Sequence, residues 1–434
     1  MNSSQMIKNK LFNNISWLVL DNIIRLFGGL LVGIWIARYL GPEKYGILSY
    51  AIAYTSLFIF CVRLGLDQII VREIVKKPRI TSYLLGTAFC MKFIGAVIAI
   101  MSICISLFFM DAAFQTKLII IVICSGFVFQ SLDVIACYYQ SMYLSKYVVI
   151  ARNCAFILCA CLNVYLIIHK YSVVYFAVVN AAGSMFTALL LIIVYKQTGN
   201  TILQWKYSSK IALRILKYSW PLALSVFLIS IHMKIDQVMI GSMLDKEQVG
   251  IYSVAVKLAE YWILFPGIIV STLMPYFVSL RESDNQLYHY RLLQLYSLMF
   301  WMGMFVGIMT IFFGEEIISL LYGEAYVGSY DALVFNIWNG IFISQALARG
   351  IWMISENLQK YRLYNNVIVV IINISANLVL IPKLGIAGAA LATLTTQALG
   401  TWVFSFLWKP LRESTWGMIR SVNPMYLLNY KGGA

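Results

Sequence analysis

Basic side chains stand inside long apolar stretches of this sequence, where a charge is costly and therefore informative. Seven basic residues stand in such stretches, and the candidates for ligand contact among them are Arg25, Lys92, Lys257 and Arg349. Lys92 and Arg349 lie nearer the cytoplasm, where a long side chain can instead extend its charge to the interface. Removing an isolated ion from water costs on the order of 20 kcal/mol in the idealised limit, so charges inside apolar spans normally face a polar cavity or one another. A guanidinium also matches the geometry of a phosphate group. We therefore expect these four residues to line a basic cavity that binds an anionic ligand.

Four carboxylates in the same stretches are candidates for ion coupling. They are Asp21, Asp133, Asp236 and Glu260. The sequence has no GxxxxGK[ST] motif for nucleotide phosphates, so ATP hydrolysis by this chain is not expected. A carboxylate that changes protonation, or that binds a cation such as Na⁺, is the alternative means of using an ion gradient. Asp133, in "FQSLDVIACYY", has no basic neighbour one helical turn away and is the most isolated of the four.

Each carboxylate also has a structural interpretation. Asp21 lies one helical turn before Arg25, and Glu260 lies three residues after Lys257, spacings at which opposite charges pair on a helix. Asp236 follows a histidine and a lysine in "IHMKIDQVMIG". A structural ion pair or hydrogen bond therefore remains an alternative to ion coupling at every one of these positions.

Glycines and a proline mark places where helices can approach closely or bend. Gly28, Gly29 and Gly33 include a small-xxx-small spacing, which predicts close helix packing and, as an alternative, a flexing point. Pro266 and Gly267 interrupt a long apolar stretch, and a proline there removes a backbone hydrogen bond. No CxxC pair occurs among the eight cysteines, and no metal site is expected.

The composition shows which elements must position these residues. Hydrophobic residues make up 61% of the 434 residues and charged residues 12%, with a mean hydropathy of +0.80. A helix of about 20 apolar residues crosses a bilayer core, and such continuous runs exclude a β-barrel. We predict an all-α integral membrane protein with twelve transmembrane helices, near residues 15–40, 46–66, 84–110, 118–139, 147–168, 173–195, 218–239, 249–277, 292–313, 330–354, 364–381 and 384–408.

Two short motifs occur twice. "ARYLGPEKYGILSYA" at 37–51 shares several residues with "LDKEQVGIYSVA" at 244–255, and "SMYLSKY" at 141–147 resembles "SENLQKY" at 355–361. The repeat predicts two six-helix lobes. Because six helices return the chain to its starting side, the lobes should be related by a pseudo-twofold axis along the membrane normal. Such lobes are typical of alternating-access transporters.

The repeat and the charges divide the chain into four parts. We predict an N-lobe at 1–196, a basic cytoplasmic linker at 197–217, a C-lobe at 218–408 and a cytoplasmic tail at 409–434. Most Lys and Arg residues, including Lys8, Lys10 and Lys431, fall on one side of the predicted topology. By the positive-inside rule this side is cytoplasmic and holds both termini. The net charge of +15 is spread over short loops, which favours contact with lipid headgroups over nucleic-acid binding.

Three segments resemble the Wzx-type polysaccharide (O-antigen) flippases of the multidrug/oligosaccharidyl-lipid/polysaccharide exporter superfamily. They are "RLFGGLLVGIWIARYLGPEKYGILSYA", "VGIYSVAVKLAEYWILFP" and "IPKLGIAGAALAT". The resemblance implies a bacterial inner-membrane protein that moves undecaprenyl-pyrophosphate-linked oligosaccharide to the periplasmic leaflet, coupled to H⁺ or Na⁺. It also implies a polysaccharide polymerase and a chain-length regulator as partners, and a lateral gate where a bent helix at Pro266 meets the first span.

Two other functions remain alternatives. A drug or cation antiporter of the same superfamily would favour a carboxylate-lined cavity. A membrane polymerase or ligase would carry a large periplasmic loop with catalytic residues, yet no predicted outer loop is long, and the HExxH, GxSxG and DDxxD motifs are absent. We therefore expect a transporter and not an enzyme.

Overall fold

The computed structural model describes residues 3–356 and 358–428, and the described residues contain helices and no strand. Lys431, counted above among the cytoplasmic charges, lies outside the described residues, as does the end of the predicted tail from residue 429 onward. The side chains of Lys8 and Lys10 are likewise outside the description.

The chain divides into two compact units, which we call unit 1 (1–234) and unit 2 (235–434). The division falls inside α10 (Ser209–Met243), a helix that begins within the predicted linker 197–217. The remainder of that linker contains the short helix η3 (Ile202–Gln204). The four-part division drawn from the sequence stays a prediction.

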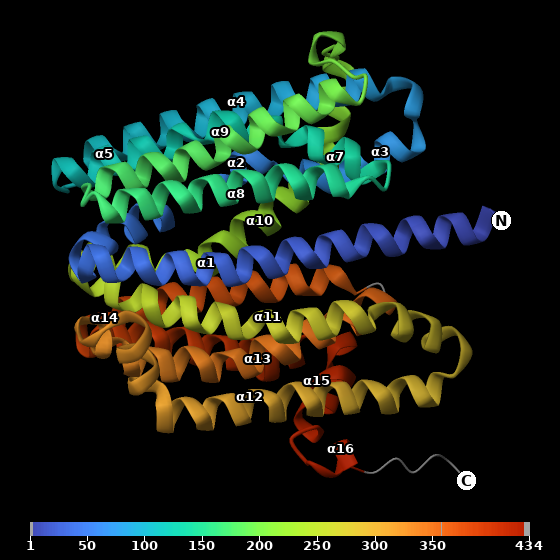
Figure 1. Ribbon diagram of the computed structural model, residues 1–434. Helices are drawn as coiled ribbons and strands as arrows, with labels where there is room; N and C mark the ends of the chain where they lie inside the picture. The colour runs from blue at the N-terminus through green and yellow to red at the C-terminus, as the bar shows by residue number, and fades with distance from the viewer. Residues whose placement is uncertain (1–2, 357, 429–434) are drawn as a thin grey trace. The chain divides into compact units, whose positions relative to one another are not determined.

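Unit 1 is a bundle of long helices in which α8 packs against α1 and α9, and α5 packs against α1 and α9. Figure 1 shows α4, α5, α8 and α9 running along one another. The elements of unit 1 before α10 are α1 (Ser3–Ser56), α2 (Ile59–Arg63), α3 (Leu66–Lys76), η1 (Pro78–Ile80), α4 (Thr81–Phe109), α5 (Phe114–Ser125), α6 (Phe127–Gln130), η2 (Ser131–Asp133), α7 (Val134–Ser141), α8 (Ser145–Ile168) and α9 (Val173–Gln197).

In unit 2, α13 is the central helix, because it packs against α11, α12 and α14. The elements that follow α10 are α11 (Lys246–Ser283), α12 (Asn285–Tyr322), η4 (Glu324–Ser329), α13 (Tyr330–Ser355), α14 (Gln359–Ala398), η5 (Leu399–Val403), η6 (Phe404–Leu407), η7 (Lys409–Leu411), α15 (Arg412–Arg420) and α16 (Met425–Leu428).

Glycines allow the chain to kink in the first long helix of unit 1 and in the last long helix of unit 2. Gly41 in α1 has φ 69° and ψ 171°, and Gly385 in α14 has φ 60° and ψ −139°. Both conformations lie in a region that is essentially restricted to glycine. Gly41 lies between the predicted spans 15–40 and 46–66, and Gly385 lies at the second residue of the predicted span 384–408, so α1 and α14 each carry parts of two spans.

Nine helical segments in the described part of the chain are long and apolar enough to cross a membrane. Two of them, Ile24–Ser56 and Gln359–Leu407, each cover parts of two predicted spans, and the predicted span 330–354 matches α13, which is not among the nine. Large apolar side chains such as Phe108 (84% exposed) face outward, as lipid contact requires. The protein is a multi-pass helical membrane protein, and the count of twelve stays a prediction.

Candidate functional site

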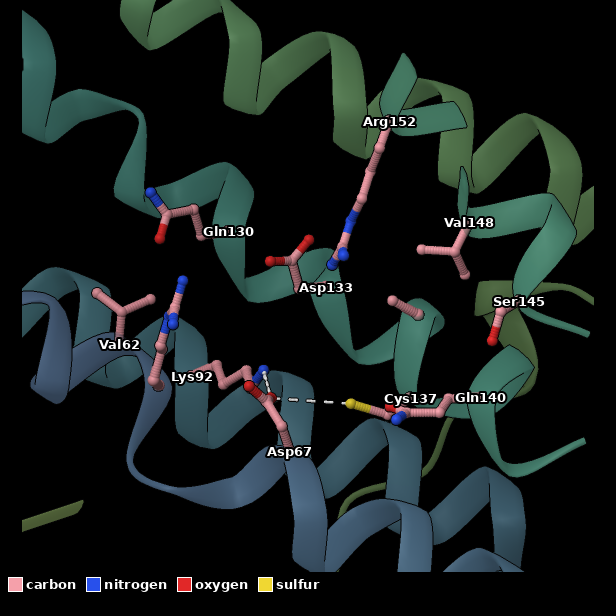
Figure 2. Close-up of a pocket in the computed structure, with 12 residues that line it drawn as sticks. Val62, Asp67, Lys92, Gln130, Asp133, Cys137, Gln140, Ser145, Val148 and Arg152 are labelled. Carbon is pink, nitrogen blue, oxygen red and sulfur yellow. Dashed lines mark hydrogen bonds and ion pairs between the residues drawn. The ribbon is translucent and has the colours of Figure 1, made fainter. Parts of the chain in front are cut away.

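A polar cavity of about 300 Å³ lies inside unit 1, between α2, α3, α4, α7 and α8 (Figure 2). Three basic and two acidic side chains line it, beside two glutamines. The lining residues are Val62, Arg63, Asp67, Lys92, Gln130, Asp133, Ala136, Cys137, Gln140, Ser145, Val148 and Arg152. Two sequence-predicted site residues, Lys92 and Asp133, therefore meet in one cavity.

Lys92 is buried and forms an ion pair with Asp67. Its side chain is 3% exposed, and its Nζ lies 2.5 Å from Asp67 Oδ1. The Asp67 side chain is 49% exposed, and the same oxygen accepts a hydrogen bond from Cys137 Sγ at 3.7 Å. A buried cation needs such a counter-ion, because desolvation alone would cost several kcal/mol. The pair is therefore nearly neutral as a unit and leaves the other charges of the cavity to face a ligand.

Asp133, Arg63 and Arg152 supply those other charges. Figure 2 shows the Asp133 carboxylate and the Arg152 guanidinium pointing toward one another across the cavity. Within the described part of the chain, neither arginine forms a hydrogen bond or an ion pair. Three basic groups against two acidic groups give the cavity a net charge of +1.

Two interruptions of helical structure place these side chains. After Arg63 the chain turns through Leu64 (φ 49°) and Gly65 (φ 63°) before α3 begins. A Cβ on Gly65 would lie 2.6 Å from Leu222 Cβ in α10, so only glycine fits this turn. The second interruption is η2, the short 3₁₀ segment that ends at Asp133 between α6 and α7. Arg63 and Asp133 therefore each stand at a break in the helical structure, and both side chains line the cavity.

Unit 2 holds a different arrangement around Asp236, which is 6% exposed. Asn377 Nδ2 donates to Asp236 Oδ1 at 2.7 Å. Thr393 Oγ1 and Tyr252 OH donate to Oδ2 at 2.6 and 2.9 Å. Asn373 Nδ2 donates in turn to Thr393 Oγ1 at 3.0 Å. The carboxylate is thus enclosed by hydrogen-bond donors from α11 and α14.

Arg349 is also enclosed within unit 2 and is 4% exposed. Its Nη1 donates to the Thr401 carbonyl at 3.2 Å and to Ser405 Oγ at 2.6 Å. Both acceptors lie in η5 and η6, where the regular α-helix has ended and backbone carbonyls are open to side chains. Arg349 therefore binds the irregular end of the last long helix, and its predicted role in substrate binding stays a prediction.

Arg25 and Asp21 form the one-turn ion pair that the sequence offered as the structural interpretation. Arg25 Nη2 lies 2.5 Å from Asp21 Oδ2, with the arginine side chain 40% exposed and the aspartate side chain 6%. Asn153 Nδ2 of α8 donates to the other Asp21 oxygen at 3.1 Å. Asp21 thus ties α1 to α8, while Arg25 keeps an exposed guanidinium.

The remaining predicted site residues are not among those that line the cavity. Lys257 and Glu260 are 4.0 Å apart on α11. A Cβ on Gly28 would meet the Phe156 ring at 2.7 Å, which supports the packing interpretation, while Gly33 and Gly267 have open space. The helix α11 continues through Pro266 as one element. The roles predicted for Gly29, Pro266 and Gly267 in packing or gating stay predictions.

Three charged residues of the cavity, Arg63, Asp67 and Arg152, were not among the predicted site residues, because they lie near the ends of the predicted spans 46–66 and 147–168. The one local signal is the glycine two residues after Arg63, which marks a turn. No cluster of three or more His, Cys, Asp or Glu side chains able to hold a metal ion occurs in the described ranges.

A family model described as "Polysaccharide biosynthesis protein" matches residues 11–281. A relative, the capsular polysaccharide biosynthesis protein CapF of Staphylococcus aureus, is 24% identical over 193 residues, which make up 44% of this chain and 48% of that protein. The match therefore spans about half the length of that relative.

Two of the solved structures that resemble this chain each cover 94% of it. One is the inward-facing conformation of a multidrug resistance MATE family transporter of the MOP superfamily, with a TM-score of 0.69 and 16% identity over 94% of this chain and 99% of the other. The other is the lipid II flippase MurJ in an inward closed conformation, with a TM-score of 0.69 and 16% identity over 94% and 90%. Both likenesses concern the fold. With the family match over more than half of its residues, the chain belongs to the polysaccharide biosynthesis protein family and has the fold of the MOP superfamily.

Proposed function

We propose that this protein flips undecaprenyl-pyrophosphate-linked O-antigen repeat units from the cytoplasmic to the periplasmic leaflet of the bacterial inner membrane by alternating access. The observation that carries the proposal is the family match over residues 11–281. The capsular polysaccharide protein of Staphylococcus aureus and the lipid II flippase MurJ, as their names say, act in polysaccharide biosynthesis and lipid flipping, which supports a lipid-linked saccharide as cargo. A polymerase and a chain-length regulator are the partners that this role implies.

The charges of the apolar helices suit such a cargo. A diphosphate with its sugars needs polar and cationic surroundings to enter the membrane, while its prenyl tail stays in lipid. Arg25 has an exposed guanidinium on a membrane helix, and Lys257 is similarly exposed, at 48%. We assign the first cargo contacts to these two residues, because their side chains are exposed although each pairs with a carboxylate of its own helix, whereas Lys92 and Arg349 are buried.

Ion coupling is assigned to Asp236. Its carboxylate is buried among oxygen- and nitrogen-bearing side chains of α11 and α14, so a proton or Na⁺ bound there would change the hydrogen bonds between two helices. Asp133 is the weaker candidate, because the net positive charge of its cavity disfavours a cation. The proposed function requires no cofactor or metal ion other than this coupling ion.

A drug or cation antiporter of the same superfamily is the second candidate function. The equal TM-scores of 0.69 to a MATE transporter and to MurJ favour neither. The family match favours the flippase. The two functions differ in what accumulates when the protein is absent.

The deciding experiment is a deletion strain scored for lipid-linked repeat units and for drug sensitivity. We expect undecaprenyl-linked intermediates to accumulate on the cytoplasmic side and surface polysaccharide to be lost, with unchanged drug sensitivity. Re-expression of the wild type should restore the polysaccharide, and expressed Asp236→Asn should not. Normal polysaccharide together with raised drug sensitivity would replace the flippase with the antiporter.

A further inference from the structure

The geometry points to a phosphate-class anion site in the cavity of unit 1, formed by Arg63 and Arg152 opposite the Asp67–Lys92 pair. The proposal goes beyond flipping: it describes an accessory site for the phosphate of an anionic lipid headgroup or for free phosphate. It would hold whether or not the protein moves a saccharide.

The charge balance of the cavity decides the sign of its ligand. Lys92 and Asp67 largely cancel, because Nζ and Oδ1 are 2.5 Å apart. Arg63 and Arg152 then face the single carboxylate of Asp133. A bound cation would meet a net positive surrounding, whereas an anion would find two guanidinium groups that have no hydrogen bond or ion pair within the described residues. Electrostatics therefore favours an anion.

The shape of the donors favours phosphate. Each guanidinium offers parallel N–H groups that can bind two phosphate oxygens at once. Gln130, Gln140 and Ser145 lie in the same lining and add neutral donors. The apolar side chains of Val62 and Val148 also line the cavity. They offer no hydrogen bond to a ligand, so its polar contacts would come mainly from the charged groups.

The size of the cavity limits the ligand. About 300 Å³ corresponds to roughly ten water molecules at about 30 Å³ each. This space accommodates a phosphate or a headgroup phosphodiester, and not a repeat unit of several sugars. In the predicted orientation Arg63 and Arg152 lie toward the cytoplasmic side, so a lipid ligand would come from the cytoplasmic leaflet.

Binding to the purified full-length protein tests the proposal in two arms. One arm titrates inorganic phosphate in detergent, and the other measures retained phosphatidylglycerol against phosphatidylcholine by native mass spectrometry. Arg63→Gln with Arg152→Gln should weaken binding of the ligand at least tenfold. Arg72→Gln is the matched control, because Arg72 is an exposed arginine of α3 that pairs with Glu73 outside the cavity lining.

Asp133→Asn tests the proposal through a gain of binding, which a misfolded protein would not show. Removing this carboxylate raises the net charge of the cavity from +1 to +2, so binding should become severalfold tighter. Phosphate binding without retained phosphatidylglycerol would identify a free-phosphate site, and the reverse would identify a lipid site. Unchanged binding in the double arginine variant, or weaker binding in Asp133→Asn, would overturn the proposal.

Discussion

The cavity of unit 1 and the Asp236 site of unit 2 surround their carboxylates in different ways. In unit 1, Asp67 and Asp133 border a cavity of about 300 Å³ and share it with three basic groups. In unit 2, Asp236 is 6% exposed and is enclosed by the hydroxyl and amide donors of Tyr252, Thr393 and Asn377. The carboxylates of the cavity lie beside basic side chains and open volume, whereas the carboxylate of Asp236 is surrounded by hydrogen-bond donors.

The two units also differ in the continuity of their helices. The fourth predicted span of unit 1 is interrupted at η2, whereas its counterpart in the repeat, α13, runs unbroken from Tyr330 to Ser355. The short helix α15 also packs against α12 and α13 in unit 2, where Tyr296 OH and Ser414 Oγ are 3.0 Å apart. The cavity of unit 1 thus borders an interrupted helix, whereas the corresponding helix of unit 2 is unbroken.

The largest effect on stability is expected at Asp236. Asp236→Ala would leave the donors of Tyr252, Thr393 and Asn377 without their acceptor, and each buried unsatisfied group costs about 1–3 kcal/mol. We expect a loss of roughly 3 kcal/mol or more, measured as the thermal unfolding midpoint of the purified protein in detergent. Tyr252→Phe, which removes one donor, should cost about 1 kcal/mol. Equal, small effects in both variants would show that the network is hydrated like the cavity of unit 1.

An intermediate and asymmetric effect is expected at the Asp67–Lys92 pair. Asp67→Asn leaves the ammonium of Lys92 buried without its counter-ion, and removing one partner of a buried pair costs about 3–5 kcal/mol. Since Asp67 is 49% exposed, water reduces this cost, and we expect about 2 kcal/mol. Lys92→Met should cost less, because the half-exposed carboxylate can be hydrated. The thermal unfolding midpoints of the two variants measure these costs. A larger loss of stability in Lys92→Met than in Asp67→Asn would contradict the cavity geometry.

The smallest effect on stability is expected at Arg25. The pair is half-exposed, with Arg25 40% and Asp21 6% exposed, and Asn153 still donates to Asp21 when the guanidinium is removed. We therefore expect Arg25→Ala to cost about 1 kcal/mol while surface polysaccharide is lost. Asp21→Asn should be no more destabilising, because it leaves only the exposed guanidinium of Arg25 without its partner. If Arg25 served only the pair, Asp21→Asn would harm transport equally, and the double variant would be no worse than either single one. Normal polysaccharide from expressed Arg25→Ala would exclude cargo contact.

The amino-acid sequence alone determined the class of this protein. Long apolar runs specify membrane helices because lipid leaves every backbone group to be satisfied within the segment. The kinks at Gly41 and Gly385 were not among the predicted bending points, although a positive φ favours glycine. The one-turn spacing of Asp21 and Arg25 predicted their ion pair, because local helical geometry fixes which side chains meet.

Only the tertiary structure decided which distant charges meet. Asp67 and Lys92 are 25 residues apart, and Asp236 and Asn377 are 141 residues apart. Hydropathy fixes where a helix crosses the membrane but leaves its rotation and its neighbours open, since those depend on side-chain packing between helices. Arg63 and Arg152 therefore looked like span-end charges in the sequence, and the turn at Gly65 and the break at η2 placed them in one cavity with Asp133.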